Sequence, residues 1–275
     1  GFVVPLDADF KNVKSFLLRL DGLASYDLAQ PGTVDANFAG TSRFTLAGEG
    51  SRPMFVTPAA IDAASGAVSA RESRRSNDYG RVAMRTSDLR GYGGQLTATV
   101  QPEIFRGAAG PPPVMFTFGY TLQEVRRQYR GFDGANFGDP TLKEWAAGVN
   151  DARHAFVVQA GANIPRVGAL TLFTRIQSGL PFTPIVRGDV DGDGRSGDRA
   201  FIPTTSGGDA ATAAQMQALL ASAPSNVRNC LESQLGRVAG RMSCRGPWTQ
   251  SMNLMLQPNI GRIRGRNASV NVVFE

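Results

Sequence analysis

Apolar and polar residues alternate in seven separate stretches of this chain, and this pattern constrains the fold more than any other feature. In the clearest stretch, residues 156–164, every even-numbered residue is apolar, whereas the odd-numbered residues include Gln159 and Asn163. Successive side chains of a β-strand point to opposite faces, so each stretch predicts a strand with one apolar and one more polar face. The stretches lie at residues 15–21, 95–101, 114–123, 156–164, 170–177, 248–257 and 268–274.

The connections between these predicted strands are alternately long and short. The long ones cover about residues 22–94, 128–151 and 178–247, and the short ones 102–113, 165–168 and 258–267. Long extracellular loops and short periplasmic turns are typical of outer-membrane β-barrels, whose tilted strands need about 9–11 residues to cross a bilayer. The strands of a soluble sandwich also alternate, but loops this long are uncommon in compact domains. The pattern favours an all-β, antiparallel transmembrane barrel over a soluble sheet protein, which stays the alternative.

Charge and motifs exclude several classes of function. The formal net charge is +6, from 29 Lys and Arg against 23 Asp and Glu, but the arginines are scattered and no basic stripe is interleaved with aromatic residues. We therefore predict no nucleic-acid binding and assign the charge to solvated loops or lipid headgroups. The one histidine, His154, has no nucleophile motif to accompany it, and no phosphate-binding loop is present. The sequence predicts that this is not an enzyme.

The ends of the chain suggest a piece of a larger barrel. No signal peptide precedes the first strand, although an outer-membrane protein must be exported. Seven strands would leave the barrel open, whereas bacterial barrels close with an even number. We expect residues 1–275 to be one partial barrel domain of a longer chain, without the plug and the closing strands.

Polar residues on the predicted strands are expected to face the barrel lumen or the plug. They are the ones that alternate with the apolar set, and apolar-out, polar-in alternation is the barrel rule. The predicted lumen-facing residues are Arg19, Asp21, Gln159, Asn163, Arg175, Gln177 and Asn253.

The last long loop contains both cysteines, Cys230 and Cys244. An even number of cysteines in an exported loop predicts a disulfide, and two buried free thiols are the alternative. The same loop has two helix-prone segments, from Asp209 to Ala221 and from about 224 to 235. They predict either a lid over the barrel or simple packing within the loop.

An Asp-rich run, residues 188–198, is the most motif-like part of the chain. Its Asp-x-Asp-x-Asp-Gly spacing resembles a loop that wraps a hard cation in oxygen ligands, although the twelfth position carries Ala200 instead of Glu. We predict one weakly bound Ca²⁺ just above the fifth predicted strand. A charged turn whose carboxylates pair with Arg187, Arg195 and Arg199 is the alternative. The predicted ligands are Asp189, Asp191, Asp193 and Asp198.

Three separated motifs resemble the late barrel region of Oar-type TonB-dependent receptors. They are residues 178–184 with the Asp-rich run and 198–202, residues 126–132 leading to 151–154, and the stretch from Cys230 to Trp248. They occur in order, and the resemblance covers about residues 90–275.

The resemblance implies a plugged barrel of about 22 strands in the outer membrane of a Gram-negative-type bacterium. It implies as partners the outer-membrane lipid, the remainder of the barrel and its plug, the TonB complex, reached through a region outside this chain, and an unknown ligand that is bound and translocated. Two alternatives stay open: an outer-membrane structural or adhesion protein without energised transport, and a secreted soluble β-protein that binds calcium.

Overall fold

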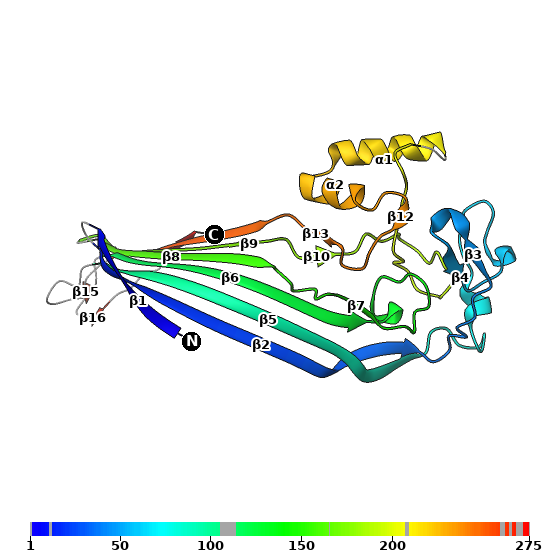
Figure 1. The fold of residues 1–275 in the computed structure, drawn as a ribbon, viewed down its shortest axis with the longest axis horizontal. Coiled ribbons are helices and arrows are strands. Elements are labelled where there is room, and N and C mark those ends of the chain that lie inside the picture. The colour runs from blue at the N-terminus through cyan, green and yellow to red at the C-terminus, as the bar shows by residue number, and fades with distance from the viewer. Residues whose placement is uncertain are drawn as a thin grey trace.

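The fold is mostly β, with one large antiparallel sheet and two short helices (Figure 1). It is seen in a computed structural model that describes residues 2–10, 13–104, 114–164, 166–206, 209–258, 262–263, 266–267 and 272–274. Side chains are described from residue 16 to 102 and, outside the gaps, from 114 to 258. The seventh predicted strand lies largely outside the described residues.

The described part of the main sheet has nine strands and does not close on itself. Its order is β1–β2–β5–β6–β8–β9–β14–β17, with β7 paired to β6. The bounds are β1 Phe2–Phe10, β2 Val13–Asp35, β5 Ala83–Ile104, β6 Val114–Tyr129, β7 Glu144–Ala147, β8 His154–Ile164, β9 Gly168–Gln177, β14 Thr249–Pro258 and β17 Val272–Phe274. Every neighbouring pair is antiparallel, as the alternating stretches predicted.

Two features of the sheet differ from the sequence prediction. A strand, β1, precedes the first predicted strand and pairs with it along the edge of the sheet. Pro5 interrupts any alternating pattern there, and an edge strand tolerates a residue without an amide hydrogen. The pair β2 and β5 also extends far beyond the predicted segments, so that the first long loop covers only residues 36–82.

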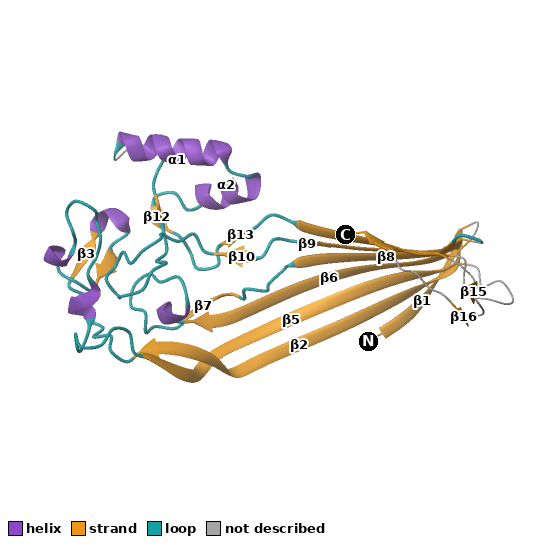
Figure 2. Cartoon of the chain, turned by 180° about the vertical axis from the view of Figure 1, so that it is seen from behind, coloured by secondary structure: helices purple, strands orange, loops and turns teal. Residues whose placement is uncertain are grey.

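All three long loops emerge at one end of the sheet (Figures 1 and 2). We name them the first loop (36–82), the second loop (130–153) and the third loop (178–248). The first carries β3 (Phe44–Leu46), β4 (Arg52–Met54) and the 3-10 turns η1 (Ala47–Glu49), η2 (Pro58–Ala60) and η3 (Ala70–Ser73). The second carries η4 (Gly131–Asp133) as well as β7. The short connection between β8 and β9 lies at the opposite end, as predicted.

The third loop contains both helices, α1 (Ala210–Ser222) and α2 (Ser225–Glu232), as the sequence predicted. Asp209 caps α1, because its carboxylate accepts the amide hydrogen of Thr212 at 2.8 Å. Short strand pairs fasten the helices to the rest of the loop: β10 (Pro181–Phe182) with β13 (Cys244–Arg245), and β11 (Phe201–Ile202) with β12 (Arg237–Val238). One further short pair, β15 (Arg262–Ile263) with β16 (Arg266–Asn267), follows β14.

Both clusters of buried apolar side chains lie in the long loops, although single residues of the sheet, such as Leu89 and Tyr129, are buried as well. One cluster joins Phe38, Phe55 and Phe132 from the first and second loops, and another places Ile202 and Leu231 of the third loop with Met216 and Leu220 of α1. No described side chain of the predicted strand segments in β8, β9 and β14 is fully buried. Both faces of this part of the sheet are therefore uncovered. Within the described residues, no helix combines the length and the apolar character needed to cross a membrane.

Candidate metal centre

The Asp-rich run folds into a tight loop because its carboxylates accept backbone amide hydrogens of the same loop. Asp189 accepts from Gly192 at 2.6 Å and from Gly194 at 2.7 Å, and Asp198 accepts from Val190 at 2.6 Å. Gly192 and Gly194 have φ of 80° and 81°, which a residue without Cβ adopts without strain. The Asp and Gly spacing thus specifies the turn itself.

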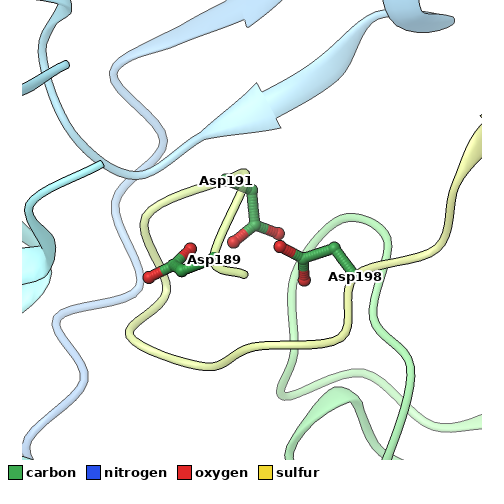
Figure 3. A group of neighbouring side chains, drawn as sticks. All are labelled: Asp189, Asp191 and Asp198. Atoms are coloured by element: carbon green, nitrogen blue, oxygen red, sulfur yellow. The ribbon is translucent and has the colours of Figure 1, made fainter. Parts of the chain in front are cut away.

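This loop brings together the carboxylates of Asp189, Asp191 and Asp198 (Figure 3). One oxygen from each lies within 4.8 Å of the others, and Asp191 and Asp198 are fully buried. Two oxygens bound to one Ca²⁺ at 2.3–2.6 Å are separated by no more than about 5.2 Å. The three carboxylates therefore meet the spacing for a shared hard cation, and they are three of the four predicted ligands.

Asp193, the fourth predicted ligand, is not part of this converging group. Its carboxylate accepts the amide hydrogen of Arg195 at 2.8 Å and a side-chain hydrogen of Asn136 at 3.2 Å. The motif places Asp193 at a ligand position, but Asp198 fills the third place because the chain turns back after Gly197.

Burial raises the pKa of every carboxyl in this loop, and repulsion from neighbouring carboxylates adds to the effect at Asp191, Asp193 and Asp198. For Asp191, desolvation is the largest cause, followed by the charges of Asp193 and Asp198, and its pKa rises to about 9. Burial and then the charges of Asp198 and Asp189 raise the pKa of Asp193 to about 7, and burial raises that of Asp198 to about 6. The pKa of Asp189 is raised by burial as well. Without a cation the site therefore holds protons near neutral pH, and a bound cation would take their place.

Two of the three arginines named as rivals of the metal, Arg195 and Arg199, have other partners. Arg199 pairs with Glu144 at 3.1 Å, and Arg195 donates to the main-chain oxygen of Phe132. Among the described residues, no ion pair joins any arginine to the four aspartates of the loop. The charged-turn alternative therefore lacks the contacts on which it depends.

The other two long loops hold the Asp-rich loop from both sides. From the first loop, the amide of Phe55 donates to the main-chain oxygen of Asp191 at 2.8 Å, and Arg74 donates to that of Asp193 at 3.0 Å. From the second loop, Asn136 donates to the carboxylates of both Asp191 and Asp193. An ion at this point would be bound where all three loops meet. Sequence reasoning missed Asn136, because nothing local in the sequence brings it to this loop.

Cys230 and Cys244 form a disulfide in the third loop, as predicted, with their Cα atoms 5.5 Å apart. The bond ties the end of α2 to β13. Gln234 lies beside it and donates to the main-chain oxygen of Cys230 at 3.1 Å.

The seven residues predicted to face the lumen share one face of the sheet. Residues directly paired across an antiparallel sheet point to the same side. The pairs Arg19–Thr99, Thr97–Thr121 and Thr117–Gln159 connect β2 to β8, and the pairs Val157–Arg175 and Phe173–Asn253 continue the same face to β14. We call this the polar face. The predicted residues on it are Arg19, Asp21, Gln159, Asn163, Arg175, Gln177 and Asn253.

The opposite, apolar face carries a row of rings near the loop end. Tyr120, His154, Phe156 and Trp248 form this aromatic row, with neighbouring centroids 5.0–6.3 Å apart. His154 belongs to the row through a hydrogen bond of 2.8 Å between its Nδ1 and the hydroxyl of Tyr120. Sequence reasoning found no nucleophile motif to accompany His154 and missed the row, whose members come from three separate segments.

Comparison with known proteins adds no family: no family model, no curated protein and no solved structure matches the chain. The resemblance to Oar-type receptors stays a prediction from its motifs.

Proposed function

We propose that this chain forms part of the wall of a transmembrane β-barrel in the outer membrane of a Gram-negative-type bacterium. We further propose that the barrel is a TonB-dependent receptor or transporter of the Oar-like kind, with about 22 strands, which binds a ligand and passes it across the membrane. The remainder of the barrel, the plug and the TonB complex are the partners that this proposal requires.

One observation carries the membrane part of the proposal: an extended sheet in which neither face is covered by protein. Leu96, Phe116, Leu122 and Met252 all lie on the apolar face, and each is 36–55% exposed. A soluble sandwich would bury this face against a second sheet. Lipid covers such a face in a barrel, while the polar face borders the lumen or the plug.

The positions of the aromatic row and the loops agree with this orientation. Tyr and Trp gather at membrane–water interfaces, because their rings are apolar and their polar atoms need hydrogen bonds. The aromatic row lies where β8 begins, next to the three long loops. The whole of β8, which begins with two members of the row, has 11 residues, the length of one crossing. The long loops would then face the cell exterior.

The second candidate is a structural or adhesion protein of the outer membrane, without energised transport. The observation in its favour is that the long loops have their own buried clusters and a disulfide. They therefore form a packed, ordered surface that a partner could bind. A plug domain encoded upstream in the complete reading frame would favour transport, and its absence would favour adhesion.

At the loop end, we propose that Asp189, Asp191 and Asp198 bind one Ca²⁺ that holds the three long loops together. The convergence of their carboxylates without arginine partners supports this role.

Membrane extraction tests the main proposal against the remaining alternative, a secreted soluble protein that binds calcium. The native protein should stay with outer membranes after a wash at high pH and should need detergent for release. Recovery in the wash without detergent would refute the membrane assignment and favour the soluble one.

A further inference from the structure

A cleft of about 610 Å³ opens between the first and third loops, and its lining includes none of the three converging carboxylates. Its walls come from η1, from the segment around Val186 and Val190, from β11 and from the first turn of α1. Most of the lining is apolar, with Val186, Val190, Phe201, Pro203 and Ala213. The cleft has the size and the apolar character of a small-molecule site.

The two ionisable side chains that line the cleft are both acidic, although the whole chain has a net charge of +6. Oε2 of Glu49 forms an ion pair with the buried guanidinium of Arg52 at 2.8 Å, which fixes the carboxylate at the cleft and compensates part of its charge. Asp209 is held as the cap of α1 by Thr212, whose hydroxyl and amide lower the pKa of Asp209 and keep it ionised. An apolar cleft with two fixed carboxylates is complementary to a molecule with an apolar body and a positive end.

We propose that this cleft binds a small organic cation, an apolar ring or chain that carries a primary ammonium or a guanidinium group. The apolar walls would cover the body of the ligand. Glu49 and Asp209 would attract its charged end, and Thr204 and Thr212 at the same cleft offer further hydrogen-bonding hydroxyls.

Two residues of the cleft wall are fastened to a candidate metal ligand. The amide of Val190 donates to the carboxylate of Asp198 at 2.6 Å, and the amide of Val186 donates to its main-chain oxygen at 2.8 Å. Calcium at Asp198 would therefore fix this wall and tighten binding in the cleft. This linkage, unlike the cleft itself, rests on the proposed calcium site.

Three fluorescent probes with the same dansyl body and different ends test the proposal on the detergent-solubilised native protein: dansylcadaverine is cationic, dansylamide neutral and dansylglycine anionic. Uptake into micelles is subtracted with a Thr204→Trp variant, which fills the cleft. We expect dansylcadaverine to bind at least about tenfold more tightly than dansylamide, and dansylglycine to bind most weakly.

Glu49→Gln and Asp209→Asn remove one charge each and keep the hydrogen bond to Arg52 and the helix cap. Each should reduce the preference for the cation about three- to tenfold, and the double variant should abolish it. Asp78→Asn, at an exposed carboxylate outside the cleft, should change nothing. Equal affinity for the three probes, or an unchanged preference in the double variant, would overturn the proposal. If dansylcadaverine binds but calcium does not increase its affinity, the proposed linkage to the calcium site is refuted, and the proposal that the cleft binds a cation is kept.

Discussion

Calcium should protect the three long loops from proteolysis, because the proposed ion lies where they meet. For a dissociation constant of about 10⁻⁴–10⁻³ M, the range of weak extracellular sites, 10 mM Ca²⁺ stabilises the bound form by about 1.4–2.7 kcal/mol. Cleavage that requires the loops to open should then slow about 10- to 100-fold. The assay is limited proteolysis in the first and third loops, with a protease that does not depend on calcium and the unfolded chain as a control.

The protection should also depend on pH. The carboxyl pKa of Asp191, about 9 in the folded loop, lies above its ordinary value of 3.8. Without metal, this group favours the folded loop at low pH, and that contribution is lost as the pH rises from about 4 through 9. Calcium must displace the proton. Its protective effect should therefore be largest near pH 8–9 and should disappear by about pH 5.

One substitution distinguishes the effect of metal binding from the effect of reduced repulsion between the carboxylates. Asp191→Asn removes one negative charge from a buried, mutually repelling group. It should protect the loops without calcium and abolish the further protection that calcium gives. Asp139→Asn, at an exposed carboxylate of the second loop, should leave the calcium response intact. An Asp191→Asn protein that responds to calcium as the native protein does would refute the proposed site.

Three further results are expected. Under denaturing conditions, alkylation followed by intact-mass measurement should modify Cys230 and Cys244 only after reduction, and two thiols that react without reductant would exclude the disulfide. Gly192→Ala should destabilise the loops by about 1–2 kcal/mol, because Gly192 has a positive φ and packs closely on the first loop. Proteolytic cleavage of the loops should then be about 5- to 30-fold faster, and an unchanged rate would contradict that packing. Val158→Arg should cost about 2–4 kcal/mol of folding free energy near the bilayer midplane, whereas Gln159→Arg should cost less, and equal costs would indicate a two-sided soluble core.

Much of the sheet could be predicted because the information is local. Residues 156–164 carry the period of two themselves, and the register found between β8 and β9 keeps Gln159 and Arg175 on one face. The upper part of β2 could not be predicted in this way. There the register with β5 shifts around Asp27 and Gln30, which interrupts the alternation.

The candidate site was predicted only as far as the local motif extends. Asp189 and Asp191 follow from the spacing, since the turn is built by their own carboxylates and by the glycines that follow them, Gly192 and Gly194. The contribution of Asn136 depends on packing between loops about 55 residues apart in the chain. Such contacts are set by tertiary structure, and no local sequence pattern predicts them. That Asp193 lies outside the converging group, while the predicted Asp198 belongs to it, has the same origin, because it depends on how the whole loop turns back.

The central claim is that the apolar face of the sheet contacts lipid, and a scan along β8 tests it most directly. Single cysteines at residues 157–161 would carry a fluorescent label in the native protein, reconstituted in vesicles that contain brominated lipids. We predict strong quenching at Val158 and Ala160 and weak quenching at Val157, Gln159 and Gly161, because the two sets point to opposite faces. Quenching that is uniform along the strand, or absent at Val158 and Ala160, would contradict the account.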